Sequence, residues 1–341
     1  MELVKTLTDL CQTPAVTGFE QAGAKKVCEL LAPLVDTVRI DTVGSVIGIR
    51  RCGRENARTV LLDAHLDQIG FLVTEVLDGG FLRFSPVGGI DPRMLLGGEV
   101  DILTAEPIYG VISCTPPHLL KPGEEDKSVP IHEMLIDTGL TDAKSRIKVG
   151  TPIVFRQKMV QLSKDSITGK CLDDRAGIAT ILYALEKLRD TALSVDLAVL
   201  ISVQEETSSL GAITGAYALR PDYAIAIDVT HAKSPDAPGE FEYGGGVVIG
   251  MGPNLNTALT KSLIKTAKAE DMEYQLEIME GFTGTNAWDL QIAGTGAATA
   301  LLSIPLRYMH TPIETIKLSD LESAGDLLYH FLRSFDGEVR L

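Results

Sequence analysis

Helix and strand patterns alternate at both ends of this chain, and a middle stretch without helical periodicity interrupts them. Amphipathic helical spacing near residues 2–13 and 20–34 is followed by strand patterns within 39–50 and 58–65. From about residue 165 the alternation resumes and runs to a last amphipathic helix at 318–335. Such alternation is typical of α/β proteins in which helices cover a buried, largely parallel sheet. The elements predicted between these ends are a helix from Asp174, a strand at 195–203, a helix near 208–220, a strand at 222–229, a helix at 257–271, and strands at 274–279 and 298–306.

Residues 70–163 follow a different pattern. Short β-like runs are separated there by Gly, Pro and Asp turns. We therefore predict a small β-barrel-like domain at 70–163, inserted into an α/β domain made of residues 1–69 and 164–341. The charged stretch at 121–127 is expected to be a mobile loop of the insert.

Composition narrows the possible partners. Among 341 residues, 46 are acidic and 31 basic, and the net charge of −15 argues against nucleic acid or an anionic membrane as partner. The N-terminal residues lack the basic and apolar regions of a signal peptide, and no stretch approaches the roughly 18 uninterrupted apolar residues of a membrane span. The five cysteines are widely spaced and include no C-x-x-C, so the sequence predicts no disulfide framework and a cytoplasmic location.

Several apolar strands end in residues that commonly bind metals. The stretch LLDAHLD supplies His65 and Asp67, and AVLISVQEE supplies Glu205 and Glu206. Ligand crevices in open α/β sheets border the carboxyl ends of the strands, so residues far apart in sequence can converge there. Three further pieces fit this pattern: AIAID with Asp228, LLSIPLRYMH with His310, and KCLDDRAG, which sets Asp173 and Asp174 directly before a helix.

Each of these features has a structural explanation when taken alone. Asp174 could cap a helix, a single His after a strand is commonly a hydrogen-bonded structural group, and paired glutamates commonly form a solvated edge. One shared cause is more economical than separate accidents at every strand end. Two divalent cations would be such a cause, because two imidazoles and three carboxylates suit zinc, cobalt or manganese and the metal charge offsets the buried acids. One of the adjacent glutamates could then bind metal while the other takes a proton from a bridging water, and the spacing does not decide which.

A series of short motifs covers essentially the whole chain: AHLDQIGFLV, VGGIDPRMLLGG, PPHLL, IDTG, KCLDDRAG, VQEE, AIDVT and IPLRYMHTPIE. In these motifs and in their order the chain resembles the cytosolic glutamyl aminopeptidases and tetrahedral (TET) aminopeptidases, a family of dinuclear metallopeptidases, some of them formerly labelled endoglucanases. The resemblance implies a three-layer α/β/α metallo-exopeptidase domain with a mixed central sheet and an inserted β-barrel-like domain for dimerisation and substrate access.

The resemblance also implies a role for each site residue. His65 and Asp228 would bind opposite metals and Asp173 would bridge them. Glu206 and His310 would complete the pair of sites. Glu205 would be the general base that activates a metal-bridging water, and Asp67 would orient His65. The implied activity is removal of N-terminal residues from short peptides by a homo-oligomer of dimers, commonly a dodecamer, with two divalent metal ions per subunit.

Some positions depart from the family pattern, and other residues are candidates for substrate contact. Gln68 stands where relatives commonly have Glu, the segment 207–209 replaces a usual Val-Gly pair, and Asn286 stands where Asp is expected. We expect these departures at the rim and substrate side of the site, where they would affect specificity. The candidates for substrate or interface contacts are Arg93, for which a surface salt bridge is the alternative, His118, Asn286 and Arg307.

Other functions stay open from the sequence. The nearest alternative keeps the metals but catalyses deacylation or carboxypeptidase cleavage. A glycosidase using paired carboxylates without metal would leave the two histidines without a role. A third alternative is a non-catalytic oligomeric homologue with a decayed site. The preferred N-terminal residue and the native metal are not encoded in these motifs.

Overall fold

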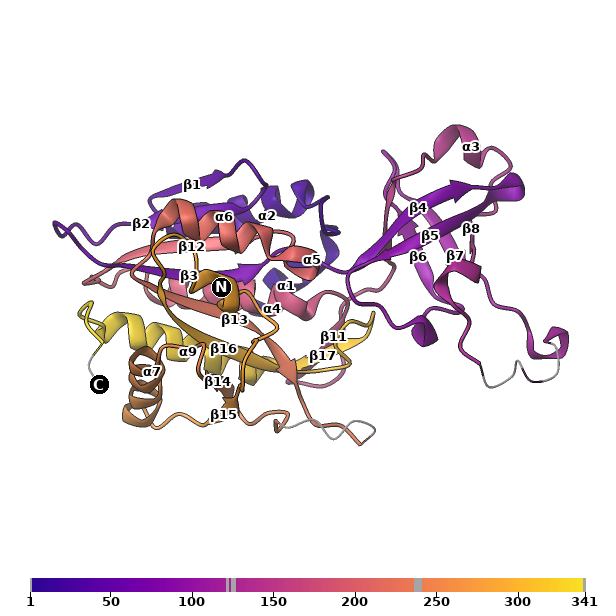
Figure 1. The fold of residues 1–341 in the computed structure, drawn as a ribbon. Helices are drawn as coiled ribbons and strands as arrows, with labels where there is room; N and C mark the ends of the chain where they lie inside the picture. The colour runs from indigo at the N-terminus through magenta and orange to yellow at the C-terminus, as the bar shows by residue number, and fades with distance from the viewer. Residues whose placement is uncertain (1, 121–122, 124–126, 236–240, 340–341) are drawn as a thin grey trace.

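The computed structural model describes residues 2–120, 123, 127–235 and 241–339. It consists of an α/β part built on a large mixed sheet and a closed six-stranded barrel that lies to one side of it (Figure 1). The expected fold class is thereby confirmed. Most of the 121–127 stretch lies outside the described residues. Within the described part of the chain, no helix is long and apolar enough to cross a membrane.

The large sheet has parallel strands at its centre and antiparallel strands at its margins. The parallel centre consists of β12 (Asp196–Ser202), β3 (Thr59–His65), β13 (Tyr223–His231) and β16 (Ala298–Arg307). Nearly every residue of these strands is buried, which explains their continuous apolar runs. The remaining strands are β1 (Thr37–Ile40), β2 (Val46–Arg50), β10 (Val160–Gln161), β11 (Ser166–Gly169), β14 (Val247–Met251), β15 (Tyr274–Ile278) and β17 (Glu314–Lys317).

Helices cover both faces of this sheet. On one face the core is completed by α1 (Leu3–Gln12), α2 (Gln21–Leu31), α4 (Leu172–Lys187), α7 (Thr257–Ala269) and α9 (Leu318–Ser334). The other face packs against α6 (Leu210–Leu219) and α8 (Ala287–Leu290). Alternating side chains of the same strands enter the two separate cores, as the period-2 geometry of a strand requires. The resulting three layers fix the strand ends in space.

The barrel is wholly antiparallel and has its own core. Its strands are β4 (Gly70–Val76), β5 (Phe81–Val87), β6 (Glu99–Ile102), β7 (Ile108–Ile112), β8 (Ile136–Asp137) and β9 (Pro152–Phe155), and a single-turn helix α3 (Ala143–Arg146) packs beside them. Phe71 packs edge-on against Phe84 and Phe155, with ring centroids 5.1 and 5.2 Å apart. Strand β10 falls in the range predicted for the insert, yet it pairs with β11 in the large sheet.

Candidate metal centre

The carboxyl ends of the parallel strands meet at one edge of the large sheet. His65 is the last residue of β3, and Asp228 lies in the second half of β13. Glu205 and Glu206 begin the short helix α5 (Glu205–Ser208), which follows β12. His310 follows β16. Because these strands run parallel, residues from widely separated parts of the sequence come to the same edge.

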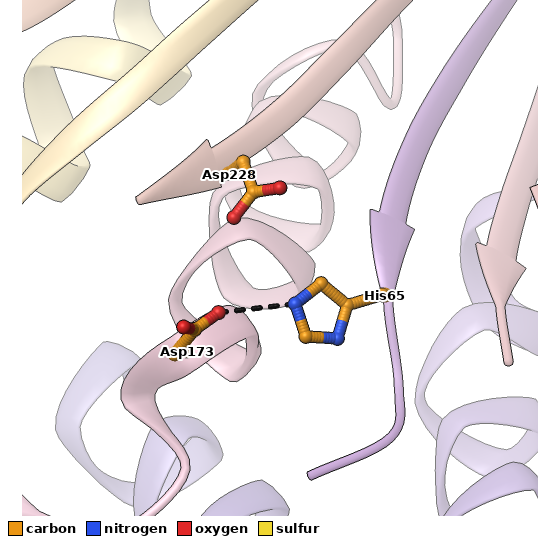
Figure 2. A group of neighbouring side chains, drawn as sticks. All are labelled: His65, Asp173 and Asp228. Carbon is orange, nitrogen blue, oxygen red and sulfur yellow. Dashed lines mark hydrogen bonds and ion pairs between the residues drawn. The ribbon is translucent and has the colours of Figure 1, made fainter. Parts of the chain in front are cut away.

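Three buried side chains form a first possible ligand group. Ligand atoms of His65, Asp173 and Asp228 all lie within 4.8 Å of one another. The Nε2 atom of His65 is 3.0 Å from Oδ1 of Asp173. Figure 2 shows the three side chains converging from β3, from the start of α4 and from β13. An imidazole and two carboxylates at this spacing could hold one cation.

A second group shares Asp173 with the first. Ligand atoms of Asp173, Glu206 and His310 also lie within 4.8 Å of one another. The Nε2 atom of His310 is 3.3 Å from Oδ2 of Asp173 and 3.4 Å from Oε2 of Glu206. Asp173 therefore turns one carboxylate oxygen toward each histidine.

The structure corrects one expectation about this arrangement. His65 and Asp228 were expected to serve opposite metals. Instead both belong to the same group, with Asp173, whereas Glu206 and His310 form the other. The sequence could not reveal this grouping, because it depends on which way each side chain leaves its strand end.

Asp67 belongs to neither ligand group, but it contacts residues of both, His65 of the first and Glu206 of the second. Its Oδ1 accepts from the backbone N–H of Glu205 at 2.9 Å, and its Oδ2 accepts from the N–H of Glu206 at 3.1 Å and from the hydroxyl of Thr17 at 2.8 Å. Oδ1 also lies 3.6 Å from Nδ1 of His65. Burial would raise the pKa of the Asp67 carboxyl, but His65 and these donors hold it below its ordinary value.

Glu314 is a structural member of the site that the sequence analysis did not single out. This buried residue begins β17, and its carboxyl oxygens accept from the backbone N–H groups of Asp173, at 3.1 Å, and His310, at 3.0 Å. One side chain thus fixes two segments that carry ligands. The only sequence signal was its place in the stretch YMHTPIE, four residues after His310.

Burial and crowding perturb every acid in the centre. Burial and the charge of Asp173 raise the pKa of Glu206 to about 8. Burial is also the main cause of the raised pKa values of Asp228 and Glu205. Asp173 differs: burial opposes its ionisation, but hydrogen bonds from His310 and His65 bring its pKa below the ordinary value. The same contact with Asp173 raises the pKa of His310 to about 9.

The chemistry of the donor set suits cations. Three carboxylates are gathered in a largely buried space where only two imidazoles offset their charge, and such crowding is unfavourable without further positive charge. Imidazole nitrogens with carboxylate oxygens are the donors that zinc, cobalt and manganese accept. The residues present therefore fit two divalent ions.

Comparison with known proteins identifies the family. The model of the M42 glutamyl aminopeptidase family matches residues 44–327 of this chain. The lysyl aminopeptidase of Pyrococcus furiosus is 32% identical over 94% of this chain and 93% of its own length. The chain belongs to the M42 glutamyl aminopeptidase family. It is accordingly a hydrolase of the exopeptidase type.

Solved structures agree with this M42 assignment. The TET aminopeptidase of a marine-sediment archaeon of the Thaumarchaeota superposes with a TM-score of 0.93 at 28% identity, over 98% of each chain. The TET1 peptidase of Pyrococcus horikoshii, described as assembling into a tetrahedron or a large octahedral shell, gives a TM-score of 0.86 at 29% identity. That match covers 98% of this chain and all of the other.

Three of the four candidate substrate contacts of this M42 peptidase lie in different environments at its surface. Arg93 lies on the barrel and pairs with Asp91, Nε to Oδ2 at 2.8 Å, as the salt-bridge alternative anticipated. His118 is exposed in a short turn of the insert. The Arg307 guanidinium lies 4.0 Å above the ring of Tyr243. These contacts do not test a role in substrate binding, so the substrate-binding roles of these residues stay predictions.

Two of the three departures from the family pattern are buried, contrary to the expectation that they lie at the rim. Asn286 donates through Nδ2 to Oδ2 of Asp63 and to Oγ of Ser202, both at 2.9 Å. Gln68 is also buried, and its Oε1 has no hydrogen-bond partner among the described residues. In the segment 207–209, Thr207 and Ser208 are exposed, as a position at the rim requires.

Proposed function

We propose that this M42 peptidase removes N-terminal residues from short peptides with the help of two divalent metal ions. His65 and Asp228 would hold one ion and Glu206 and His310 the other, with Asp173 shared between them. The proposal depends on one observation. Asp173 belongs to both ligand groups, and its two carboxylate oxygens face two different histidines, His65 and His310. Zinc, cobalt and manganese all suit this donor set.

When bound, such ions polarise a substrate carbonyl and make a water molecule more acidic. The remaining chemistry falls to the side chains. Glu205 belongs to neither ligand group, yet its carboxyl lies close enough for the charges of His65 and Asp173 to act on it. We assign it the role of general base: it takes the proton of the attacking water and returns it to the leaving amine. Asp67 positions this base through the Glu205 backbone N–H.

The adjacent glutamates offer a matched pair of variants. Glu205→Gln should retain two metal ions per chain and lose about 10²–10⁴-fold in rate on an aminoacyl chromogenic substrate. Glu206→Gln changes the neighbouring residue in the same way but removes a ligand, so it should lower metal occupancy as well. A Glu205→Gln variant with the activity of the unaltered protein would reject the assignment of the base.

Substrates with free and blocked N-termini distinguish the alternatives. An aminopeptidase cleaves the free-amine peptide and not its N-acetylated form, whereas a deacylase or carboxypeptidase acts on the blocked compound. Full activity in a strong chelator would favour a metal-independent glycosidase mechanism. Absence of all four activities (aminopeptidase, deacylase, carboxypeptidase and glycosidase) in metal-loaded protein would favour a non-catalytic homologue.

We further infer a homo-oligomer built from dimers, acting in the cytoplasm. Two observations support this inference: the TET1 relative is described as forming a tetrahedron or an octahedral shell, and the five cysteines are all free thiols. In this proposal the barrel, formed by strands β4 to β9, contributes contacts between subunits and limits access to short peptides. Light scattering should give a mass several times 36.6 kDa, and a monomer would contradict the inference.

A further inference from the structure

The barrel approaches the candidate metal centre through a pair of glycines. Gly88 and Gly89 directly follow β5, and the last residue of β5 pairs with the first residue of β4. Strand β4 in turn begins only a few residues after His65, where the chain leaves the large sheet. The two glycines therefore lie next to the junction between the barrel and the α/β part.

Both glycines contact the second ligand group. The carbonyl oxygen of Gly89 lies 2.9 Å from Nδ1 of His310. A Cβ atom added at Gly89 would lie 3.1 Å from the same nitrogen, and one added at Gly88 would lie 3.3 Å from Oε2 of Glu206. Neither position thus has room for a side chain without displacing the imidazole or the carboxylate.

The hydrogen bond to Gly89 determines which nitrogen of His310 faces the other ligands. A carbonyl oxygen can only accept, so Nδ1 of the imidazole is the donor. Nε2 then remains for an ion, and it lies 3.3 Å from Oδ2 of Asp173 and 3.4 Å from Oε2 of Glu206. Histidines that bind metals commonly donate their other N–H to a carbonyl or carboxylate, which fixes the direction of the ring.

The position of the His310 ring depends on such outside contacts. The residue follows β16 and has a φ of 59°, in the left-handed region, which side chains other than glycine adopt only where neighbouring groups hold them. Its backbone N–H donates to Oε1 of Glu314 at 3.0 Å. The side chain is 35% exposed, so packing alone does not fix it. In the described part of the chain, the Gly89 carbonyl is the one hydrogen-bond partner of Nδ1.

We propose that Gly88 and Gly89 form a positioning element through which the barrel completes the second metal site. The Gly89 carbonyl directs the imidazole of His310, and the missing side chains leave space for this ring and for the Glu206 carboxylate. The inference rests on the pair of metal ions proposed above. It adds that one of the two sites requires the barrel in its place.

The two sites should respond differently to a change in the barrel. Among the described residues, the side chains of His65 and Asp228 form no hydrogen bond or ion pair with the barrel. The first ion should therefore bind whether or not Gly89 keeps its position. Coupling between two events is reciprocal, so binding of the second ion should in turn hold residues 87–91 against the α/β part.

Gly89→Ala tests the proposal without removing any ligand. The backbone at Gly89 lies outside the left-handed region, so alanine is not strained there. Its methyl group has to displace the His310 ring by a few tenths of an ångström. The second ion should bind about tenfold more weakly and the first unchanged. In crystals held at the free zinc concentration that half-fills the second site of the unaltered protein, anomalous scattering should show that site only roughly a tenth filled in the variant.

Two further variants separate this effect from general damage. Gly281→Ala adds the same methyl group in open space, with no atom within 4 Å, and should leave both affinities unchanged. Replacing Ile90 by the corresponding α-hydroxy acid converts the carbonyl of Gly89 into that of an ester, a weaker acceptor, and adds no atom beside the ring. This substitution should also weaken the second ion alone, and it covers the event that Gly89→Ala folds poorly.

Hydrogen exchange supplies a readout without crystals. Exchange at the backbone N–H groups of residues 87–91 should slow when the second zinc ion binds to the unaltered protein, and less so in Gly89→Ala at the same zinc concentration. Equal affinities for both ions in Gly89→Ala and the unaltered protein, or equal losses at both sites, would overturn the positioning role while leaving the metal pair intact. Fewer than two ions in the unaltered protein would contradict the metal pair itself and the inference with it.

Discussion

Replacing Asp67 by Asn tests whether this carboxylate organises the centre. The carboxylate accepts hydrogen bonds from the N–H groups of Glu205 and Glu206 and from Thr17, and it faces Nδ1 of His65. An asparagine has one acceptor oxygen. If the asparagine oxygen accepts from the N–H of Glu205, as Oδ1 of Asp67 does, the amide NH₂ takes the place of Oδ2. This NH₂ can donate to the Thr17 hydroxyl, but it cannot accept from the N–H of Glu206, because both groups are donors. One hydrogen bond to a charged acceptor is then lost, which costs about 1.5–3 kcal/mol.

A loss of about 2 kcal/mol corresponds to roughly a 30-fold change in an equilibrium constant. Asp67→Asn should therefore weaken metal binding about 30-fold, within the range found when groups that orient metal ligands are changed. Metal affinity is measured by competition with a chromophoric chelator, and kcat/KM is measured at saturating metal. The matched control is Thr17→Val, which removes one donor to the same carboxylate, at 2.8 Å, but leaves the carboxylate charge and its hydrogen bonds to the backbone of Glu205 and Glu206 in place. This variant should lower the free energy of unfolding but change metal affinity only a few-fold. Unchanged affinity in Asp67→Asn, or an equal loss in Thr17→Val, would refute the reasoning.

Three further predictions concern the ligands and the pH dependence of folding. His310→Ala should lower metal occupancy measured by elemental analysis, because it removes the imidazole of the second group; full occupancy would count against that role. Metal-free protein should gain about 2.7 kcal/mol in free energy of unfolding when zinc is present at 100 times its dissociation constant, measured by urea unfolding, and an unshifted curve would contradict binding to the folded state. Burial raises the pKa of Glu20 from 4.5 to about 6. The folded state therefore keeps this proton longer than the unfolded state, and stability falls as pH rises through this window. Glu20→Gln should become more stable relative to the unaltered protein by about 2 kcal/mol in total as pH rises from about 3.5 to about 7, with most of the change between pH 4.5 and 6; a pH-independent difference in the free energy of unfolding would exclude the raised pKa.

Strongly periodic segments of the fold were predictable from the sequence. Continuous apolar runs between helical patterns correspond to β3, β12, β13 and β16, because strands buried on both faces need apolar residues at every position. The inserted barrel was predictable from its closely spaced turns. Strands β14 and β17 were not predicted as strands, since each has only four or five residues and pairs with partners distant in sequence.

The candidate site was predictable as far as the strand ends determine it. Residues at the carboxyl ends of parallel strands share an edge whatever the detailed packing, so the convergence of His65, Asp228 and Glu206 followed from topology. The grouping of ligands did not follow, because it depends on side-chain direction. Nor did the role of Glu314, which accepts from the backbone of two segments brought together only by the complete fold.

The central proposal is that two metal ions share Asp173. Crystals grown with zinc, with diffraction data collected on both sides of the zinc absorption edge, would locate each ion from its anomalous scattering. We predict two peaks per chain, one beside His65 and Asp228 and the other beside Glu206 and His310, each contacted by a different oxygen of Asp173. A single peak, or two peaks of which one lies away from Asp173, would contradict the account.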